Sequence, residues 1–300
     1  MSRYLLTRRS VLSALVGGAC AWPAMNVLAQ DPMPSRLREP VFRVANNNGA
    51  AKSPAHPLDP ALDYATTTLQ NIRTTLTDYT CTIVKRERVN GTLNDYEYMF
   101  AKVRNRKVDN GQLTTPLSVY LYFLKPSGVK GREVIYVDGQ NNDKMCAHEG
   151  GLQGRLLPTV WLKPDSMLAM RGQLYPITEI GIENLVIKLI ERGEREKSVA
   201  TSTEVQVEFR KGAKINGREC TLLEVKHPTK RPTYDFFVAQ IFIDDELNLP
   251  VRYAAYDWPE TPEGRPGVLE EYTYLDIKTN VGLTDEDFDP HNPNYNFYRK

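Results

Sequence analysis

The chain has 300 residues, of which 41% are hydrophobic and 25% are charged, a balance typical of a globular protein. This composition excludes a wholly disordered chain, a collagen-like chain and a multi-pass membrane protein. With 38 Lys and Arg against 37 Asp and Glu, the chain is nearly neutral, so nucleic-acid binding through a strongly basic surface is disfavoured.

Residues 1–29 have the three parts of an export signal. A basic start that includes Arg8 and Arg9 precedes an uncharged, mostly apolar run at residues 11–21, and no acidic residue occurs before the expected cleavage point. The small residues that follow predict cleavage after Ala29. The paired arginines before the apolar run are typical of a twin-arginine signal, which the twin-arginine export machinery reads; a general secretory signal is the alternative.

The signal predicts a periplasmic or otherwise exported protein, which would be tethered to a membrane only if the signal is not cleaved. Cys20 lies inside the signal, and the small residues before it leave lipidation as an alternative. Beyond the signal the chain has Cys81, Cys146 and Cys220. In an oxidising compartment these three allow one disulfide at most, and the alternative is three buried thiols.

Residues 30–59 are rich in Pro and Asn and have no sustained period, so they are predicted to be a flexible linker. The remainder, residues 60–300, has the length of one strand-rich domain. We expect this domain to open with a helix. Asp59 is a candidate N-cap, a proline suits the first helical position, and apolar residues recur at spacings of three and four as far as Leu76.

Strand patterns fill most of the remaining chain. Asn90-Gly91 is the strongest hairpin signal, and Asn216-Gly217 is a second one. A second amphipathic helix is expected from Ile180 to a point near Gly193. The expected strands cover residues 79–83, 96–100, 119–123, 131–138, 144–148, 205–210, 219–226, 236–243, 251–258 and 269–277.

These patterns predict a mainly β (α+β) fold. Its centre is a curved antiparallel sheet or half-barrel of roughly nine to eleven strands, with two main helices packed on or in the concave side. Several strands are apolar on both faces, so both faces must be covered. The helices can cover one face, and we expect the other to close on itself or to hold something apolar.

Two resemblances to known families support this fold. Ile243-Asp244, Leu249-Pro250-Val251-Arg252, Asp276-Ile277 and the run from Leu283 to Phe288 resemble the C-terminal half of the bacterial lipoprotein-carrier superfamily of the LolA, LolB and RseB type. The resemblance implies a periplasmic curved sheet that holds acyl chains in an apolar concavity.

The second resemblance extends over about residues 70–300 and is to a secreted bacterial family called domain of unknown function 1571. It is carried by the segments Pro116–Leu121, Gly131–Val134, Tyr136-Val137, Ala147–Gly151, Tyr175–Thr178 and Gly181-Ile182. This family implies a secreted protein with a carrier-like fold, and it implies no catalytic residue.

The chain has no motif for catalysis, cofactor binding or metal binding. It lacks Gly-x-Ser-x-Gly, the phosphate-binding loop and His-Glu-x-x-His, so we expect neither an enzyme nor a cofactor. His148-Glu149 is its one adjacent His–acid pair. His227 and His291 do not have metal-ligand spacing from this pair, so no metal site is predicted.

Five residues are the candidates for lining a ligand cavity. Leu121 and Phe123 share one face of one expected strand, and Phe237, Ile241 and Ile243 share one face of another. We expect an exported soluble binding protein that holds a lipid, a lipoprotein acyl chain or another apolar ligand in a half-barrel cavity, and that binds no nucleic acid.

Two alternatives remain open. One is an envelope sensor of the RseB kind with an envelope protein partner, which an exposed apolar patch would favour. The other, less favoured, is an exported enzyme with an unrecognised site, which a cleft of ionisable groups with perturbed pKa values would favour.

Overall fold

The computed structural model describes residues 56–298 except 202 and 262, and these belong to one compact unit, Lys52–Lys300. The predicted export signal of residues 1–29, with Arg8, Arg9 and the cleavage point after Ala29, lies outside the described residues. So do residues 30–55 of the predicted linker. The first helix begins at Asp59, one residue before the predicted start of the domain.

The helices are α1 (Asp59–Thr75), α2 (Gly151–Leu156) and α3 (Ile182–Val199), and the 3-10 turns are η1 (Asn141–Asp143), η2 (Ile177–Glu179) and η3 (Asp285–Phe288). The strands are β1 (Asp78–Val89), β2 (Thr92–Leu93), β3 (Glu97–Arg104), β4 (Lys107–Asp109), β5 (Gln112–Thr115), β6 (Ser118–Lys125), β7 (Glu133–Val137), β8 (Met145–His148), β9 (Val160–Leu162), β10 (Gln206–Ile215), β11 (Arg218–Lys226), β12 (Val238–Asp244), β13 (Leu249–Tyr256) and β14 (Val268–Thr279).

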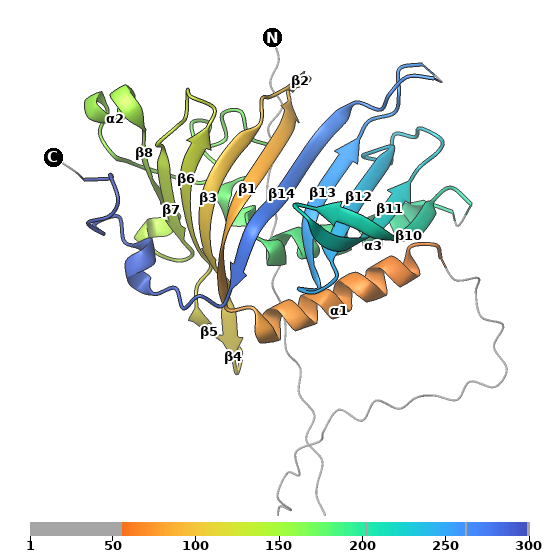
Figure 1. Cartoon of the computed structure of the whole chain (residues 1–300), viewed down its shortest axis with the longest axis horizontal. Coiled ribbons are helices and arrows are strands. Elements are labelled where there is room, and N and C mark those ends of the chain that lie inside the picture. The colour runs from red at the N-terminus through yellow and green to blue at the C-terminus, as the bar shows by residue number, and fades with distance from the viewer. Residues whose placement is uncertain (1–55, 202, 262, 299–300) are drawn as a thin grey trace, which may run out of the picture. The chain divides into compact units, whose positions relative to one another are not determined.

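One antiparallel sheet of twelve strands organises the domain (Figure 1). Its order is β10-β11-β12-β13-β14-β1-β3-β6-β7-β8-β9, with β2 paired to β1, while β4 and β5 form a separate hairpin. The last long strand, β14, pairs with the first, β1, and so joins the two halves of the chain. The sheet is open, with β10 and β9 at its edges. The predicted fold class is confirmed, with more strands than the nine to eleven expected.

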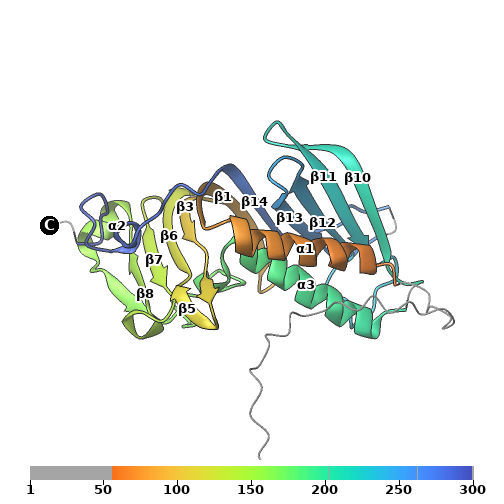
Figure 2. The same cartoon turned by 90° about the horizontal axis from the view of Figure 1, so that it is seen from below.

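The hairpin turns form where the sequence predicted them. Asn90 and Gly91 both have positive φ, as do Asn216 and Gly217, which is the conformation that a two-residue turn between twisted strands requires. Register shifts interrupt β1, β12 and β13, and bulges of this kind bend and twist a sheet. Figures 1 and 2 show the resulting curvature.

Helices α1 and α3 lie side by side on one face of the sheet (Figure 2). Alternate residues of the strands, such as Cys81 and Ile83 of β1, point toward them. The sequence predicted that the second helix would end near Gly193, and this was wrong, because α3 continues to Val199. Gly193 is a contact point between the helices. A Cβ there would lie 2.8 Å from the Leu62 side chain of α1, closer than side-chain contacts normally come.

On the opposite face, the C-terminal segment that follows β14 covers the part of the sheet formed by β6, β7 and β8. Phe288, Tyr295 and Phe297 of this segment pack against Tyr120 of β6 and Ile135 of β7 in a separate apolar cluster. The sequence analysis expected this face to close on itself or to hold an apolar ligand. The chain instead supplies its own aromatic side chains, which bury the part of that face formed by β6, β7 and β8.

The three cysteines of the domain, Cys81, Cys146 and Cys220, are all buried and free. Burial raises the pKa of Cys81 and of Cys220, and raises the pKa of Cys146 to about 12, so each thiol stays protonated at neutral pH. Of the two alternatives left by the sequence, the structure has the buried thiols. No helix within the described residues is long and apolar enough to cross a membrane.

Candidate functional site

The helix-covered face of the sheet contains two adjoining cavities. The inner cavity, between α3 and the sheet, has a volume of about 320 Å³, and the outer cavity, next to β8 and β9, has a volume of about 430 Å³. The two cavities adjoin each other, because five residues line both of them: Leu121, Phe123, Gln173, Tyr175 and Ile180. Each volume falls within the range of about 300–1,000 Å³ that is usual for small-molecule sites.

The inner cavity is apolar at one end and polar at the other. Ile83, Met99 and Leu121 of the sheet face Leu185 and Leu189 of α3 at the apolar end. The polar end is lined by Lys85 and Glu87 of β1, Tyr253 of β13 and Glu270 and Tyr272 of β14. An amphiphilic molecule would match both ends of such a cavity.

A continuous network of hydrogen bonds holds the polar end in place. The Tyr272 hydroxyl donates to Glu87 Oε1 at 2.5 Å, and Lys85 Nζ donates to Glu87 Oε2 at 3.2 Å. The Tyr253 hydroxyl donates to Glu270 Oε1 at 3.2 Å, and Arg192 of α3 donates to the same oxygen at 3.4 Å. These buried side chains are therefore positioned before any ligand binds.

Each cation that lines the inner cavity already has an acidic partner. Lys85 pairs with Glu87 and Lys188 with Glu179, each at 3.2 Å. Arg192 lies 3.6 Å from Asp235, which also pairs with Arg195. The cavity therefore offers no free cation to a negatively charged ligand group.

The tyrosines of the inner cavity are firmly protonated. Burial raises the pKa of Tyr175, Tyr253 and Tyr272, and neighbouring Glu270 raises each of them further. For Arg192, burial alone would lower the pKa, but Tyr253, Glu270 and Tyr175 together raise it. At neutral pH these tyrosines can donate hydrogen bonds, but they are poorly matched to proton transfer, which needs a pKa near the working pH.

The outer cavity is mostly apolar. Val134, Met145, Ala147 and Leu162 of the sheet line it, together with Leu157 and Leu168 from the segments before and after β9. Arg132 is paired with Glu149 at 3.0 Å at its edge. Gly150 lies so close to the backbone of Lys130 and Gly131 that no Cβ could be accommodated there.

The five predicted lining residues are found in three places. Leu121 and Phe123 line both the inner and the outer cavity. Ile241 and Ile243 line a third, smaller cavity of about 80 Å³ between the sheet and helices α1 and α3. Phe237 lines none of the cavities found in the described part of the chain. Its ring lies 6.2 Å from that of Trp258, because the alternation of β12 does not extend back to this residue.

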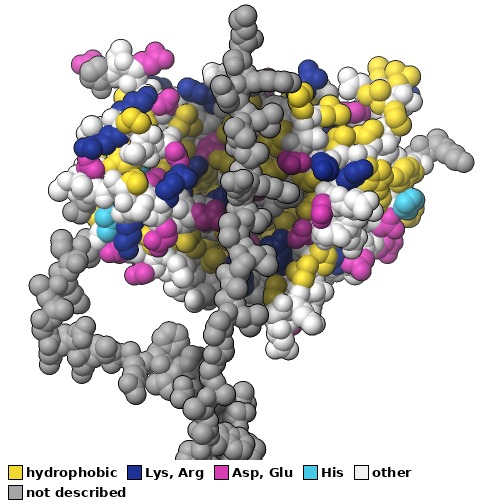
Figure 3. Space-filling view, turned by 180° about the vertical axis from the view of Figure 1, so that it is seen from behind, with side chains coloured by type: hydrophobic (Ala, Val, Ile, Leu, Met, Phe, Trp, Pro, Cys, Tyr) yellow, Lys and Arg dark blue, Asp and Glu magenta, His cyan; other side chains and the backbone are white. Residues whose placement is uncertain are grey.

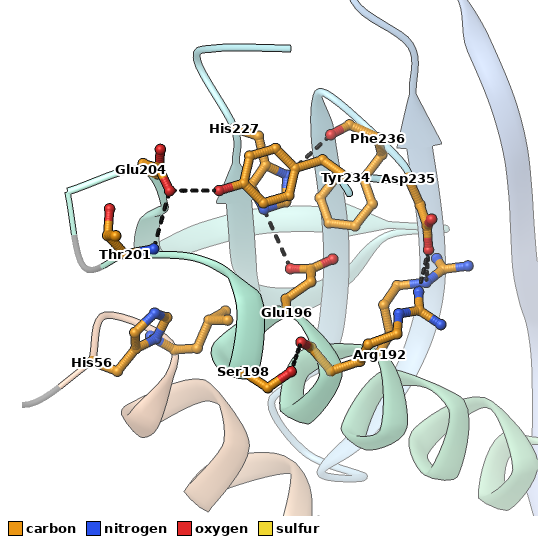
Figure 4. A network of polar contacts seen from close by, with 12 residues as sticks. His56, Arg192, Glu196, Ser198, Thr201, Glu204, His227, Tyr234, Asp235 and Phe236 are labelled. Atoms are coloured by element: carbon orange, nitrogen blue, oxygen red, sulfur yellow. Dashed lines mark hydrogen bonds and ion pairs between the residues drawn. The ribbon is translucent and has the colours of Figure 1, made fainter. Parts of the chain in front are cut away.

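A buried histidine lies at the C-terminal end of α3, beside this third cavity (Figure 4). His227 is fully buried, stacks on Tyr234 at 4.2 Å and has its Nδ1 3.0 Å from the Phe236 carbonyl oxygen. Since a carbonyl only accepts, Nδ1 carries a proton. Nε2 lies 3.3 Å from Glu196 Oε2. This contact joins the residue that follows β11 to α3, one turn after Arg192.

The His148, His227 and His291 side chains each have other neighbours in the described part of the chain. Among residues 56–298, apart from the two that are not described, no group of three or more His, Cys, Asp or Glu side chains could hold an ion. His148 Nδ1 lies 3.0 Å from the Thr159 hydroxyl, and its neighbour Glu149 pairs with Arg132. His291 lies beside Asp289 on the surface.

The polar end of the inner cavity was not predicted from the sequence. Lys85 and Glu87 continue the alternation of Cys81 and Ile83, so they fall on the same face of β1 as the core residues. The sequence feature that could have revealed this end is the pair of charged residues at alternate positions whose side chains fall on the buried face of the strand. Their partners on β14, Glu270 and Tyr272, could not be assigned without the β1–β14 pairing.

Residues 76–297 match a family described as a protein of unknown function, DUF1571. This chain belongs to the DUF1571 family. The match covers the whole sheet and both cavities, and it confirms the resemblance found in the sequence. No curated protein matches this DUF1571 chain.

Solved structures similar to the chain include proteins of the lipoprotein-carrier group. Pseudomonas aeruginosa MucB, in its complex with MucA, is 15% identical with a TM-score of 0.39, covering 77% of this chain and 60% of that one. Mycobacterium tuberculosis lipoprotein LppX is 14% identical with a TM-score of 0.38, covering 77% and 100%. A LolA superfamily protein from Nitrosomonas europaea is 10% identical with a TM-score of 0.30, covering 76% and 97%. Likenesses this low carry no argument about what the chain binds.

Proposed function

We propose that this chain is an exported binding protein that holds one amphiphilic molecule, a lipid or a lipoprotein acyl chain, on the concave face of its sheet. The observation that carries the proposal is the pair of adjoining cavities, which share Leu121, Phe123, Gln173, Tyr175 and Ile180. Burying an alkyl chain there would contribute about 0.8 kcal/mol for each methylene removed from water. The burial of several methylenes of an acyl chain therefore offsets the entropic cost of association.

The charges of the inner cavity select the polar part of the ligand. Because Lys85, Lys188, Arg192 and Arg195 are all paired with carboxylates, an anionic group placed there would have to break an existing ion pair. An uncharged group, such as an ester or a hydroxyl, could instead hydrogen-bond with Tyr175 or Gln173. We therefore propose that the end of the ligand in the inner cavity has no net negative charge.

Binding accounts for the site better than catalysis does. The ionisable groups that converge in the inner cavity include tyrosines whose pKa values are raised away from neutrality. No described cavity holds a recognisable nucleophile and base pair, and none of the three buried thiols lines a described cavity.

The test is native mass spectrometry of the protein purified from the exported fraction, combined with solvent extraction of the same sample. A stoichiometric adduct with the mass of a lipid is expected. Leu121→Trp, which fills the junction of the two cavities, is expected to remove the adduct. Ile180→Trp fills the same junction from the connection before α3 and serves as a second variant if Leu121→Trp does not fold.

Tyr122→Trp is the matched control, because Tyr122 neighbours Leu121 on β6 but packs in the cluster on the opposite face. Its adduct should persist. A protein that carries no adduct, and takes up none when neutral lipids and acylated peptides are offered, would contradict the proposal. Preferential uptake of free fatty acids in the inner cavity would contradict the assignment of its polar end.

A further inference from the structure

A patch of exposed apolar side chains borders the outer cavity. Six large hydrophobic residues are exposed within 17 consecutive residues, and they are Leu152, Leu156, Leu157, Val160, Met167 and Leu168. Leu156 is 83% exposed and Met167 is 92% exposed. In Figure 3 hydrophobic side chains gather at the upper right, the end of the molecule that carries α2 in Figure 1. Single exposed leucines are ordinary, but a contiguous group marks an interaction surface.

The patch is continuous with the outer cavity. Leu157, Val160 and Leu168 belong to the patch and also line that cavity. An apolar chain could therefore pass from whatever covers the patch into the cavity without crossing water.

Free cations surround the patch. Lys130, Arg155, Lys163 and Arg171 are exposed, and none of them forms an ion pair among the described residues. Between Gly150 and Gly172 the single carboxylate is Asp165, against three cations. By contrast, the cations that line the inner cavity are all paired with carboxylates. The local positive charge is thus a property of this segment and not of the nearly neutral chain.

We propose that this patch docks on the surface of a membrane that contains anionic lipids. Leucine and methionine side chains would enter the boundary between head groups and acyl chains, and the surrounding cations would contact the head groups. An exposed apolar patch was also the feature expected for a protein partner. A protein is nevertheless the less suited occupant, because leucine is under-represented among the residues that dominate protein interfaces and no strongly exposed aromatic ring lies in the patch. Transfer of a ligand between membrane and cavity through this surface rests on the proposed function, whereas the docking does not.

Vesicle co-sedimentation of the protein purified from the exported fraction tests the docking. Vesicles of phosphatidylcholine with phosphatidylglycerol are compared with vesicles of phosphatidylcholine alone. We expect binding to the anionic vesicles, weaker binding to the neutral ones, and loss of the difference at high ionic strength.

Two double variants separate the apolar and the charged contributions. Leu156→Ser with Met167→Ser should weaken the partition coefficient by at least about tenfold. Lys163→Gln with Arg171→Gln should weaken it by about fivefold per cation removed, on anionic vesicles alone. All four side chains are exposed, so the fold is expected to be retained.

Val108→Ser with Leu113→Ser is the matched control, since both residues are about half exposed on the β4–β5 hairpin, away from the patch. Unchanged vesicle binding by this control supports the proposal, and an equal loss would overturn it. Absence of vesicle binding, or a dimer or protein complex held by the patch instead, would also overturn it. The cavity variant Leu121→Trp should still dock. If the protein docks but carries no lipid, the proposed function fails and the docking stands.

Discussion

Replacing Glu133 with Gln is expected to loosen the C-terminal segment from the sheet. Glu133 is 1% exposed on β7 and forms no ion pair with any cation of the described residues. It accepts hydrogen bonds from the Asn296 amide at 2.7 Å, from Asn296 Nδ2 at 3.0 Å and from the Tyr120 hydroxyl at 3.2 Å. The two bonds from Asn296 join the C-terminal segment to β7, and the third joins β6 to β7.

The magnitude follows from the count of donors. A glutamine keeps one acceptor oxygen but turns its amide group toward at least one of the Asn296 donors, so one bond to a charged acceptor is lost. Such a bond contributes about 1.5–3 kcal/mol, and an unsatisfied buried donor costs a similar amount. We therefore expect Glu133→Gln to lower the free energy of unfolding by about 2 kcal/mol, and Glu133→Ala, which leaves three donors unpaired, by about 3–5 kcal/mol.

Urea unfolding and amide hydrogen exchange are the assays. Exchange of the Asn296 amide should accelerate in both variants, while amides of α3 on the other face should change only by the global loss of stability. A double-mutant cycle with Asn296→Ala isolates the coupling between the two residues. If Glu133→Gln changes stability by less than about 0.5 kcal/mol, or if the Asn296 amide keeps its protection, the carboxylate does not hold the segment.

Three further predictions concern other parts of the molecule. Gly150→Ala should destabilise the protein by more than about 1 kcal/mol in urea unfolding, since a Cβ there meets the backbone of Gly131. Gly128→Ala is the control and should be almost neutral, because nothing lies near its Cβ. Equal effects of the two substitutions would refute the close approach of Gly150 to Gly131. Thiol titration should find no reactive Cys81, Cys146 or Cys220 in the native protein and all three after unfolding without reductant, and a missing pair would indicate a disulfide. Burial alone would raise the pKa of Asp244, but hydrogen bonds from Arg218, Leu247 and Glu246 lower it below its usual 3.8. A carboxyl whose pKa is lower in the folded than in the unfolded protein stabilises the fold above its unfolded pKa, and this contribution is lost as the pH falls through its folded pKa. Asp244→Asn should therefore be less stable at neutral pH, and should lose less stability than the unmodified protein between about pH 5 and pH 2. Parallel profiles of stability against pH would contradict this.

Local signals predicted much of the fold because they act over a few residues. Two Asn-Gly pairs produced positive-φ turns at the expected positions, and the apolar stripe from Leu62 onward produced α1. The end of α3 was misjudged for a tertiary reason. Gly193 allows close contact with Leu62, and the sequence does not distinguish this role from that of a helix stop.

The candidate site was only partly predictable. Leu121 and Phe123 were predicted as lining residues from a strand that is apolar on both faces, and both line the cavities. The prediction for Phe237 assumed an alternation that the chain does not maintain before β12. Glu87, Glu270 and Tyr272 come from strands that are distant in sequence, so only the pairing of β1 with β14 brings them together.

The sequence alone determined the class of fold, because side-chain periodicity and turn residues are read from neighbours along the chain. It also determined that both faces of the sheet needed cover. Tertiary structure decided what provides that cover: α1 and α3 on one face, and the C-terminal aromatic residues over β6, β7 and β8 on the other. It also decided where cover is incomplete. A cavity is the space left by side chains from distant elements, and no local pattern in the chain encodes its position.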